Sequence, residues 1–157
     1  MITVYHRTLR QKSLRTLSDK IPGSVIVIEQ SNLDELTTFA ADSAFNIDVL
    51  KDGLDLFEVP RLEKVDGVTY LFVRFPVADS RDVATRTLLV AVSSDAVVVM
   101  ADNLTAELRG LIESDTFITT QKTKVVLQIL GRVNQMYERA LTSIRRQLQR
   151  SKVRPEQ

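Results

Sequence analysis

The chain has 157 residues, of which 44% are hydrophobic and 26% charged, a composition typical of one folded domain or of one domain with a helical extension. It contains no cysteine, which excludes disulfides, thiolate metal sites and cysteine nucleophiles, and its charged N-terminus lacks the apolar core of a signal peptide. Its apolar runs are far shorter than the roughly 20 residues needed to cross a bilayer, so we expect the chain as given to be soluble.

The N-terminal half predicts two strands followed by two helices. A short strand is expected over residues 2–5, with His6 beside it at the surface, and the β-branched run over residues 25–28 predicts a buried strand. Ser31 is the expected N-cap of an amphipathic helix over residues 33–43. A second, shorter helix is expected over residues 47–54.

Two hairpins follow. Residues 61–65 and 68–75 are strand-like and flank Asp66-Gly67, a strong two-residue turn signal. Residues 88–92 and 96–100 flank Ser93-Ser94-Asp95 in the same way. Residues 104–112 again show helical spacing, which predicts a further helix. Strands and helices thus mix along the chain, which indicates an α+β domain over residues 1–118.

A long helix is predicted over residues 119–152, within a C-terminal segment of residues 119–157. Apolar residues step through it by three and four, as in a packing seam: Val126, Leu130, Val133, Tyr137, Ala140 or Leu141, Ile144 and Leu148. A helix of about 30 residues extends about 45 Å, which exceeds a compact domain of this size. We therefore expect its far end to need a partner.

The net charge of +1 hides a strong asymmetry. Residues 29–66 contain ten acidic and three basic residues, whereas residues 132–154 contain seven basic residues and one acid. Such a separation indicates a surface that attracts cations in the middle of the chain and a positive helix at its end. The alternative is that both are ordinary solvated faces.

Little in the sequence points to catalysis. His6 is the single histidine, without a second histidine or cysteine for a zinc site, and glycine-rich phosphate loops are absent. We therefore predict that the chain is not an enzyme.

The acidic stretch is the candidate metal site. Asp52, Asp55 and Glu58 recur every third residue and would share a helix face if the helix continued that far. Mg²⁺ prefers carboxylate and water oxygens, so these three residues are the predicted, weak Mg²⁺ ligands. The alternative is that Asp55 and Glu58 cap or solvate a turn while Asp52 faces water.

The basic helix suggests a different function. Nucleic-acid phosphates are one possible partner for its cations, although no helix-turn-helix, aromatic RNA-binding motif or zinc finger accompanies them: Arg139, Arg145, Arg146, Arg150, Lys152 and Arg154. A second possible partner is another helix, which would pack on the apolar stripe as a coiled coil.

Four segments, in this order, resemble the cytoplasmic domain of the CorA-type magnesium and divalent-cation transporters. They are Ser24-Val-Ile-Val-Ile-Glu with Leu33-Asp-Glu-Leu; Asp52-Gly-Leu-Asp with Glu58-Val-Pro-Arg-Leu-Glu; the hairpin sequence from Arg86 to Met100; and the helical sequence from Val126 to Ile144. The likeness covers about residues 24–148.

The resemblance implies a mixed β-sheet sandwiched by helices in an α/β domain, assembled as a homopentamer on the cytoplasmic side of the cell membrane. It implies transport of Mg²⁺, Co²⁺ or a related cation by a pore in two further transmembrane helices, and regulation by intracellular Mg²⁺ held between neighbouring domains. The family's intersubunit carboxylate matches Asp52. On this basis we expect an excised regulatory domain, with a stand-alone interaction module as the alternative and no nucleic-acid partner.

The sequence also departs from the family. Lys51 stands where many relatives have glutamate, the usual strand tryptophan is absent, and the long helix carries arginines where relatives often carry acids.

Overall fold

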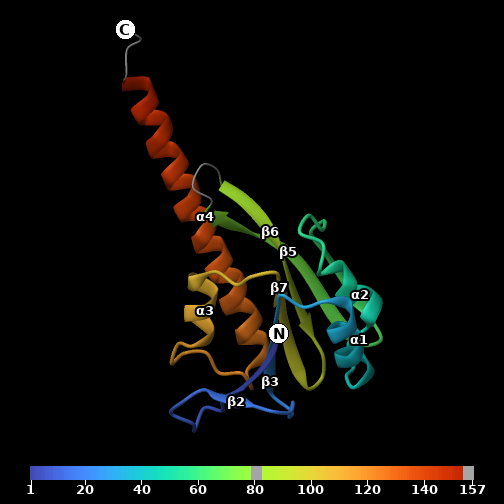
Figure 1. Cartoon of the computed structure of the whole chain (residues 1–157). Helices are drawn as coiled ribbons and strands as arrows, with labels where there is room; N and C mark the ends of the chain where they lie inside the picture. The colour runs from blue at the N-terminus through green and yellow to red at the C-terminus, as the bar shows by residue number, and fades with distance from the viewer. Residues whose placement is uncertain (79–82, 154–157) are drawn as a thin grey trace.

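A computed structural model describes residues 1–78 and 83–153 of the chain. In this part, seven strands form one sheet in the order β2-β1-β3-β7-β6-β5-β4, with helices on both of its faces (Figure 1). The β3–β7 pair is parallel and the other neighbours are antiparallel, so the predicted mixed sheet is confirmed. The strands are β1 (Ile2–His6), β2 (Arg15–Leu17), β3 (Ser24–Glu29), β4 (Arg61–Val65), β5 (Val68–Ala78), β6 (Val83–Val92) and β7 (Ala96–Ala101).

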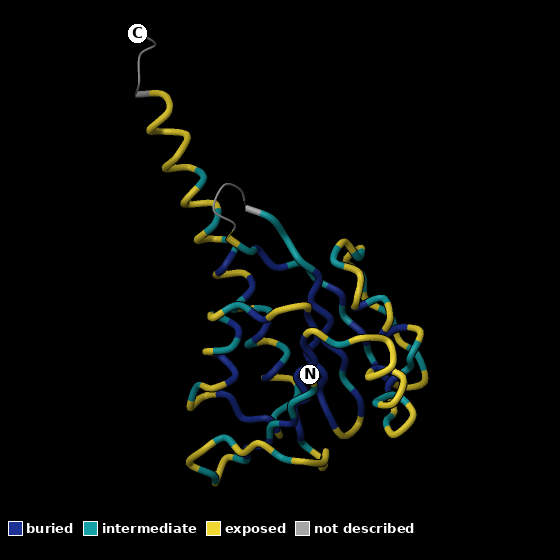
Figure 2. The backbone as a smooth tube through the Cα atoms, viewed as in Figure 1, coloured by how far each residue is buried: buried dark blue, intermediate teal, exposed yellow. Residues whose placement is uncertain are grey.

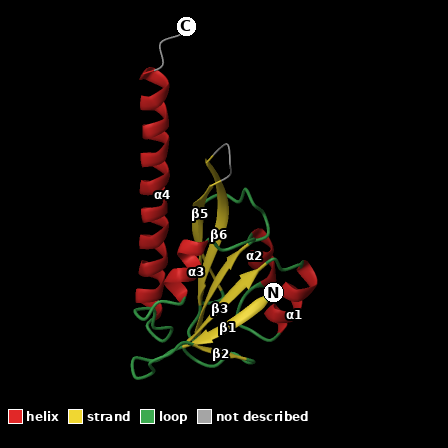
Figure 3. Cartoon of the chain, turned by 60° about the vertical axis from the view of Figure 1, so that its left-hand side comes forward, coloured by secondary structure: helices red, strands yellow, loops and turns green. Residues whose placement is uncertain are grey.

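The centre of the sheet explains its apolar sequences. Every residue of β3 and β7 is buried, because helices cover both faces and both sets of alternating side chains enter a core (Figures 2 and 3). Val25 and Val27 pack on the side of the long helix, whereas Ile26 and Ile28 pack on the opposite side. The continuous β-branched run therefore reflects burial on two faces.

Helices α1 (Leu33–Ala41) and α2 (Ile47–Asp52) cover one face, close to the predicted positions. The predicted N-cap of α1 was wrong by one residue. Asn32 caps the helix by accepting from the backbone N–H of Glu35 at 2.9 Å, and Ser31 instead accepts from the N-terminal ammonium group. The chain end thus occupies the hydroxyl that the sequence pattern assigned to the cap.

Helices α3 (Ala106–Ile112) and α4 (Lys122–Val153) cover the other face. Helix α4 begins three residues later than predicted, because Thr119 is buried in the preceding connection and exchanges hydrogen bonds with the backbone of Arg7. The buried seam is also rotated slightly from the predicted stripe. Its buried members are Val125, Ile129, Val133 and Met136.

One further expectation fails at the N-terminus, and one strand there was not predicted. Residues 15–17 form the edge strand β2, which no alternation in the sequence predicted. His6 is buried rather than at the surface, at the end of β1, where it pairs with Arg15 of β2.

The distal half of α4 leaves the sheet. From residue 139 onward its described residues are exposed, except for the half-buried Ala140 and Ile144 (Figure 2). Arg154 and residues 155–157 of the predicted helical segment lie outside the described residues. Among the described helices, none is both long enough and apolar enough to cross a membrane.

Candidate functional site

The acidic stretch begins at the C-terminal end of α2. Asn46 starts this helix by accepting from the backbone N–H groups of Asp48 and Val49, which leaves Asp52 in the last turn. Gly53 follows where a Cβ atom would lie 3.0 Å from Met100 Sδ, so the chain passes closely over β7 and turns outward. A carboxylate at a helix C-terminus faces the negative end of the helix dipole, so a nearby cation is favourable for Asp52.

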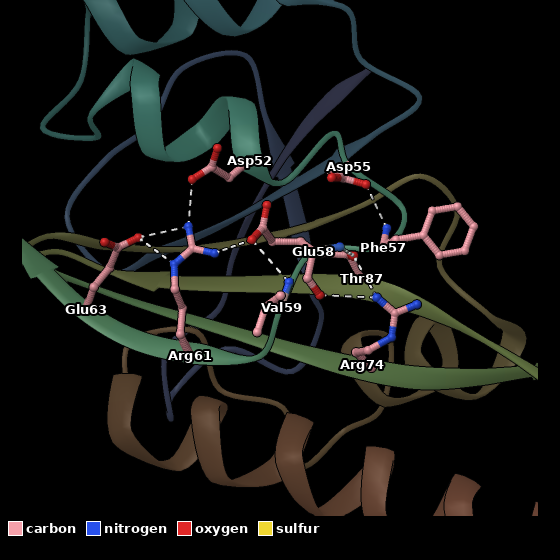
Figure 4. Close-up of polar contacts among 9 residues, drawn as sticks. All are labelled: Asp52, Asp55, Phe57, Glu58, Val59, Arg61, Glu63, Arg74 and Thr87. Carbon is pink, nitrogen blue, oxygen red and sulfur yellow. Dashed lines mark hydrogen bonds and ion pairs between the residues drawn. The ribbon is translucent and has the colours of Figure 1, made fainter.

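That cation is Arg61 on the edge strand β4 (Figure 4). Its guanidinium group donates to Asp52 Oδ2 at 2.6 Å, to Glu63 Oε1 at 3.2 Å and to Glu58 Oε1. Its centre also lies 4.0 Å from the centroid of the Phe72 ring, in a cation–π contact. We call these four charged residues, Asp52, Glu58, Arg61 and Glu63, the Arg61 cluster.

The pKa of Arg61 is raised. Partial burial lowers this pKa, but the hydrogen bonds and negative charges of Glu58 and Glu63 outweigh it. Arg61 therefore stays fully charged at any physiological pH. The cluster as a whole contains three carboxylates and one permanent cation.

A second arginine, Arg74 on β5, holds the loop that carries Asp55 and Glu58 (Figure 4). Its guanidinium group donates to the carbonyl oxygens of Leu56 at 3.0 Å and Glu58 at 3.2 Å. The same group is anchored by the hydroxyl of Thr85 at 2.8 Å. This clamp fixes the loop against β5 and β6.

The three predicted ligands are placed differently from one another. Asp52 and Glu58 meet through Arg61, whereas Asp55 caps its own turn by accepting from the backbone N–H of Phe57 at 2.8 Å. Within residues 1–78 and 83–153, no three carboxylate or histidine side chains are grouped so as to hold a metal ion. The guanidinium group occupies the centre toward which a metal's ligands would point.

Sequence reasoning did not identify Arg61 and Arg74 as the organising residues. One signal for Arg61 was available: residues 61 and 63 alternate onto the same face of a strand, which pairs an arginine with Glu63. No sequence pattern indicated the role of Arg74, because its partners are backbone carbonyl groups in a loop, 16 and 18 residues away along the chain.

A second ion pair, away from the acidic stretch, was also missed. Glu29 is buried at the end of β3 and accepts from the backbone N–H of Leu104 at 2.8 Å and from Arg109 Nη2 at 2.7 Å. Both acceptor roles fall on one carboxylate oxygen, which fixes the start of α3 against the sheet. This pair serves the fold.

The sequence matches no protein-family model and no curated protein. Solved structures do match. The CorA magnesium transporter from Methanocaldococcus jannaschii superposes with a TM-score of 0.76 at 16% identity, over 96% of this chain and 49% of its own. The soluble domain of the same CorA superposes with a TM-score of 0.76 at 17% identity, over 96% of this chain and 62% of its own. This chain has the CorA soluble-domain fold.

The cytoplasmic domain of ZntB from Vibrio parahaemolyticus also matches, with a TM-score of 0.73 at 11% identity, over 94% of this chain and 63% of that one. The predicted fold class and the resemblance to CorA-type cytoplasmic domains are therefore confirmed at the level of fold. The chain spans between about half and just under two thirds of their lengths.

Proposed function

We propose that this chain is the cytoplasmic regulatory domain of a CorA-like transporter of Mg²⁺ or a related divalent cation such as Co²⁺. The observation that carries the proposal is the superposition on CorA over 96% of the chain, on a sequence whose four CorA-like segments follow in the family's order. In this proposal the full protein is a homopentamer in the cell membrane, and the chain itself performs no catalysis.

The proposed mechanism is a shift between two packings of the domains. A divalent cation held between neighbouring copies favours the packing with the pore closed, and its loss frees the pore. The ion can shift the equilibrium between the two packings only by as much as its binding free energy differs between them. An ion that binds weakly therefore shifts the packing gradually as its concentration rises.

Asp52 is the proposed contact for the ion. Its side chain is 46% exposed, and Arg61 donates to its Oδ2 atom, which leaves the Oδ1 atom to contact an ion. Three carboxylates around an arginine do not form a closed metal site within one chain, so a bound Mg²⁺ would keep most of its waters. In this proposal Glu58 supports Asp52 through Arg61, and Asp55 adds negative charge beside them.

Two experiments test the proposal. The first is to sequence the native reading frame beyond the codon for Gln157. Two apolar segments of spanning length would support the transporter, whereas a stop codon at that point would refute it and favour an interaction module.

The second experiment measures the thermal midpoint with and without millimolar Mg²⁺. We expect a Mg²⁺-dependent rise that Asp52→Asn removes and Asp48→Asn retains. Asp48 is the matched control because it lies on the same helix and is exposed, with a single 3.4 Å ion pair to Lys51. Equal shifts in all three proteins would remove Asp52 from the sensing role.

The exposed distal half of α4 favours one alternative, a binding module for nucleic acid. Residues 139–153 carry five basic residues and no acid. Binding through phosphates would fall steeply as salt rises. Retention on single-stranded or duplex nucleic acid that declines in this way would support the module, and no retention at low salt would eliminate it.

A further inference from the structure

A groove lies beside α1, on the face of the sheet opposite α3 and α4 (Figure 1). Its volume is about 620 Å³, and it is lined by β1, by residues 18–20, which follow β2, and by one side of α1 with its C-cap. We call it the α1 groove. Its lining residues all differ from those of the Arg61 cluster. Small-molecule sites in proteins measure about 300–1,000 Å³, so this volume fits a small ligand.

The floor of the α1 groove is apolar. Ile2 and Val4 of β1 and Phe39 of α1 line it, and all three pack on the core at this side of the sheet. The buried Phe45 stacks on Phe39 with ring centroids 5.8 Å apart and an interplanar angle of 20°, which holds the Phe39 ring in place. The groove therefore offers aliphatic side chains and a fixed aromatic ring to the carbon atoms of a ligand.

The rim of the α1 groove is acidic. Among its ten lining residues, four are acidic and one is basic. Glu35 pairs with the N-terminal ammonium group at 3.2 Å. In the part of the chain that the structure describes, no ion pair neutralises the other three, Asp19, Asp34 and Asp42. An acidic rim over an apolar floor is the complement of a ligand that is both cationic and aliphatic.

The acidic residues are spread along the groove. Asp34, Thr38 and Asp42 follow one another every four residues, so they lie along one side of α1. Asp34 is in the first turn and Asp42 is the C-cap, and eight residues of helix rise by about 12 Å. Phe39 lies between them. The groove thus presents two carboxylates near its ends with apolar surface between, which is the complement of two ammonium groups joined by methylenes.

The chain itself places an ammonium group at one end of the groove. Lys20 Nζ lies 5.9 Å from the centroid of the Phe39 ring and donates to the backbone carbonyl oxygen of Asp42. Lys20 is exposed, and its flexible stem lets it leave this position. A ligand's ammonium group can therefore take the place that Lys20 occupies.

We propose that the α1 groove binds a linear aliphatic polyamine. One terminal ammonium group displaces Lys20 beside Asp42, the other lies beside Asp34, and the methylene chain covers the apolar floor. A hydrated metal ion presents only water to this floor, and an anion is repelled by the rim. Binding needs neither a second copy of the chain nor an ion at Asp52, so it is independent of the proposed transporter function.

The experiment is isothermal titration calorimetry of the chain with spermidine, in salt that screens exposed charges beyond about 8 Å. We expect one spermidine to bind per chain. Ethylenediamine, whose two charges are too close together to reach both ends of α1, should bind at least about tenfold more weakly.

Two double variants separate the groove from the net charge. Asp34→Asn with Asp42→Asn should lower the affinity for spermidine at least about tenfold, because both terminal ammonium groups lose a charged acceptor. Asp48→Asn with Asp115→Asn removes the same charge from exposed side chains outside the groove and should bind nearly as wild type does. All four side chains are exposed, so circular dichroism should show unchanged folds.

A gain of binding tests the competition with Lys20. Lys20→Met should raise the affinity for spermidine about threefold, because the ammonium group over Phe39 is removed. Lys124→Met, the same change at an exposed lysine of α4 on the other face of the sheet, should leave the affinity nearly unchanged.

Four outcomes would overturn the proposal. The first is no binding at millimolar spermidine. The second is an equal loss in both double variants, which would show that spermidine responds to net charge alone. The third is binding of ethylenediamine as tight as that of spermidine, and the fourth is a Lys20→Met variant that binds no more tightly than Lys124→Met.

Discussion

Replacing Arg61 by methionine tests whether a single guanidinium group organises the acidic stretch. Methionine keeps an unbranched apolar stem over Phe72 but removes three ion pairs and a cation–π contact at 4.0 Å. Partly exposed ion pairs contribute about 0.2–1 kcal/mol each, and the cation–π contact about 0.5–1 kcal/mol. The three carboxylates that remain also repel one another.

We therefore expect Arg61→Met to cost about 2 kcal/mol, which in a protein of this size lowers the thermal midpoint by about 4–8 °C. Urea and thermal unfolding followed by circular dichroism measure the loss. Arg10→Met, the same change at an exposed arginine, is the control and should stay within about 0.5 kcal/mol of wild type. A loss in Arg61→Met no larger than in this control would refute the organising role.

The same variant tests whether a divalent cation can take the place of the Arg61 guanidinium group. With the guanidinium group removed, Asp52, Glu58 and Glu63 lose the cation that they share, and their negative charge is left for a hydrated divalent cation to offset. Mg²⁺ at ten times its dissociation constant would restore about 1.4 kcal/mol by mass action. We expect the Mg²⁺-dependent rise in midpoint to be larger in Arg61→Met than in wild type. Equal rises would show that Arg61 does not compete with the ion.

The remaining predictions concern the fold. Gly131→Ala should stabilise α4 by about 0.5–1 kcal/mol in urea unfolding, because Gly131 is exposed and a Cβ atom there meets nothing within 4 Å. Gly67→Ala should instead destabilise by about 1 kcal/mol, since the turn holds Gly67 at φ +81°. Burial raises the pKa of Tyr70, so the unfolded state loses the phenol proton first and stability falls as pH rises above about 10. Tyr70→Phe should lower stability at pH 7 by about 1 kcal/mol, through loss of the hydrogen bond from the backbone N–H of Asn46, and should weaken the fall in stability above about pH 10.

The strands at the centre of the sheet could be predicted because burial on two faces leaves a direct mark on the sequence. The runs at residues 25–28 and 96–100 are β-branched or apolar without interruption, and Asp66-Gly67 specifies its turn through positive φ at both residues. The edge strand β2 left no such mark. It has three residues, of which two are exposed, and it exists because β1 offers it unpaired backbone groups.

The carboxylates of the site could be predicted, but their arrangement could not. Spacing by three placed Asp52, Asp55 and Glu58 on one imagined helix face, whereas α2 ends at Asp52. The chain then turns, and Arg61 reaches Asp52 because the edge strand β4 crosses back past the end of α2. This meeting depends on the order of strands in the sheet, which is set by contacts between residues far apart in the sequence.

The position of Arg61 has a consequence for how the proposed sensor would respond. Any divalent ion at Asp52 shares its carboxylate with a guanidinium group that stays charged, so attraction to the ion is partly cancelled before it binds. We therefore expect such an ion to bind weakly and to keep most of its waters.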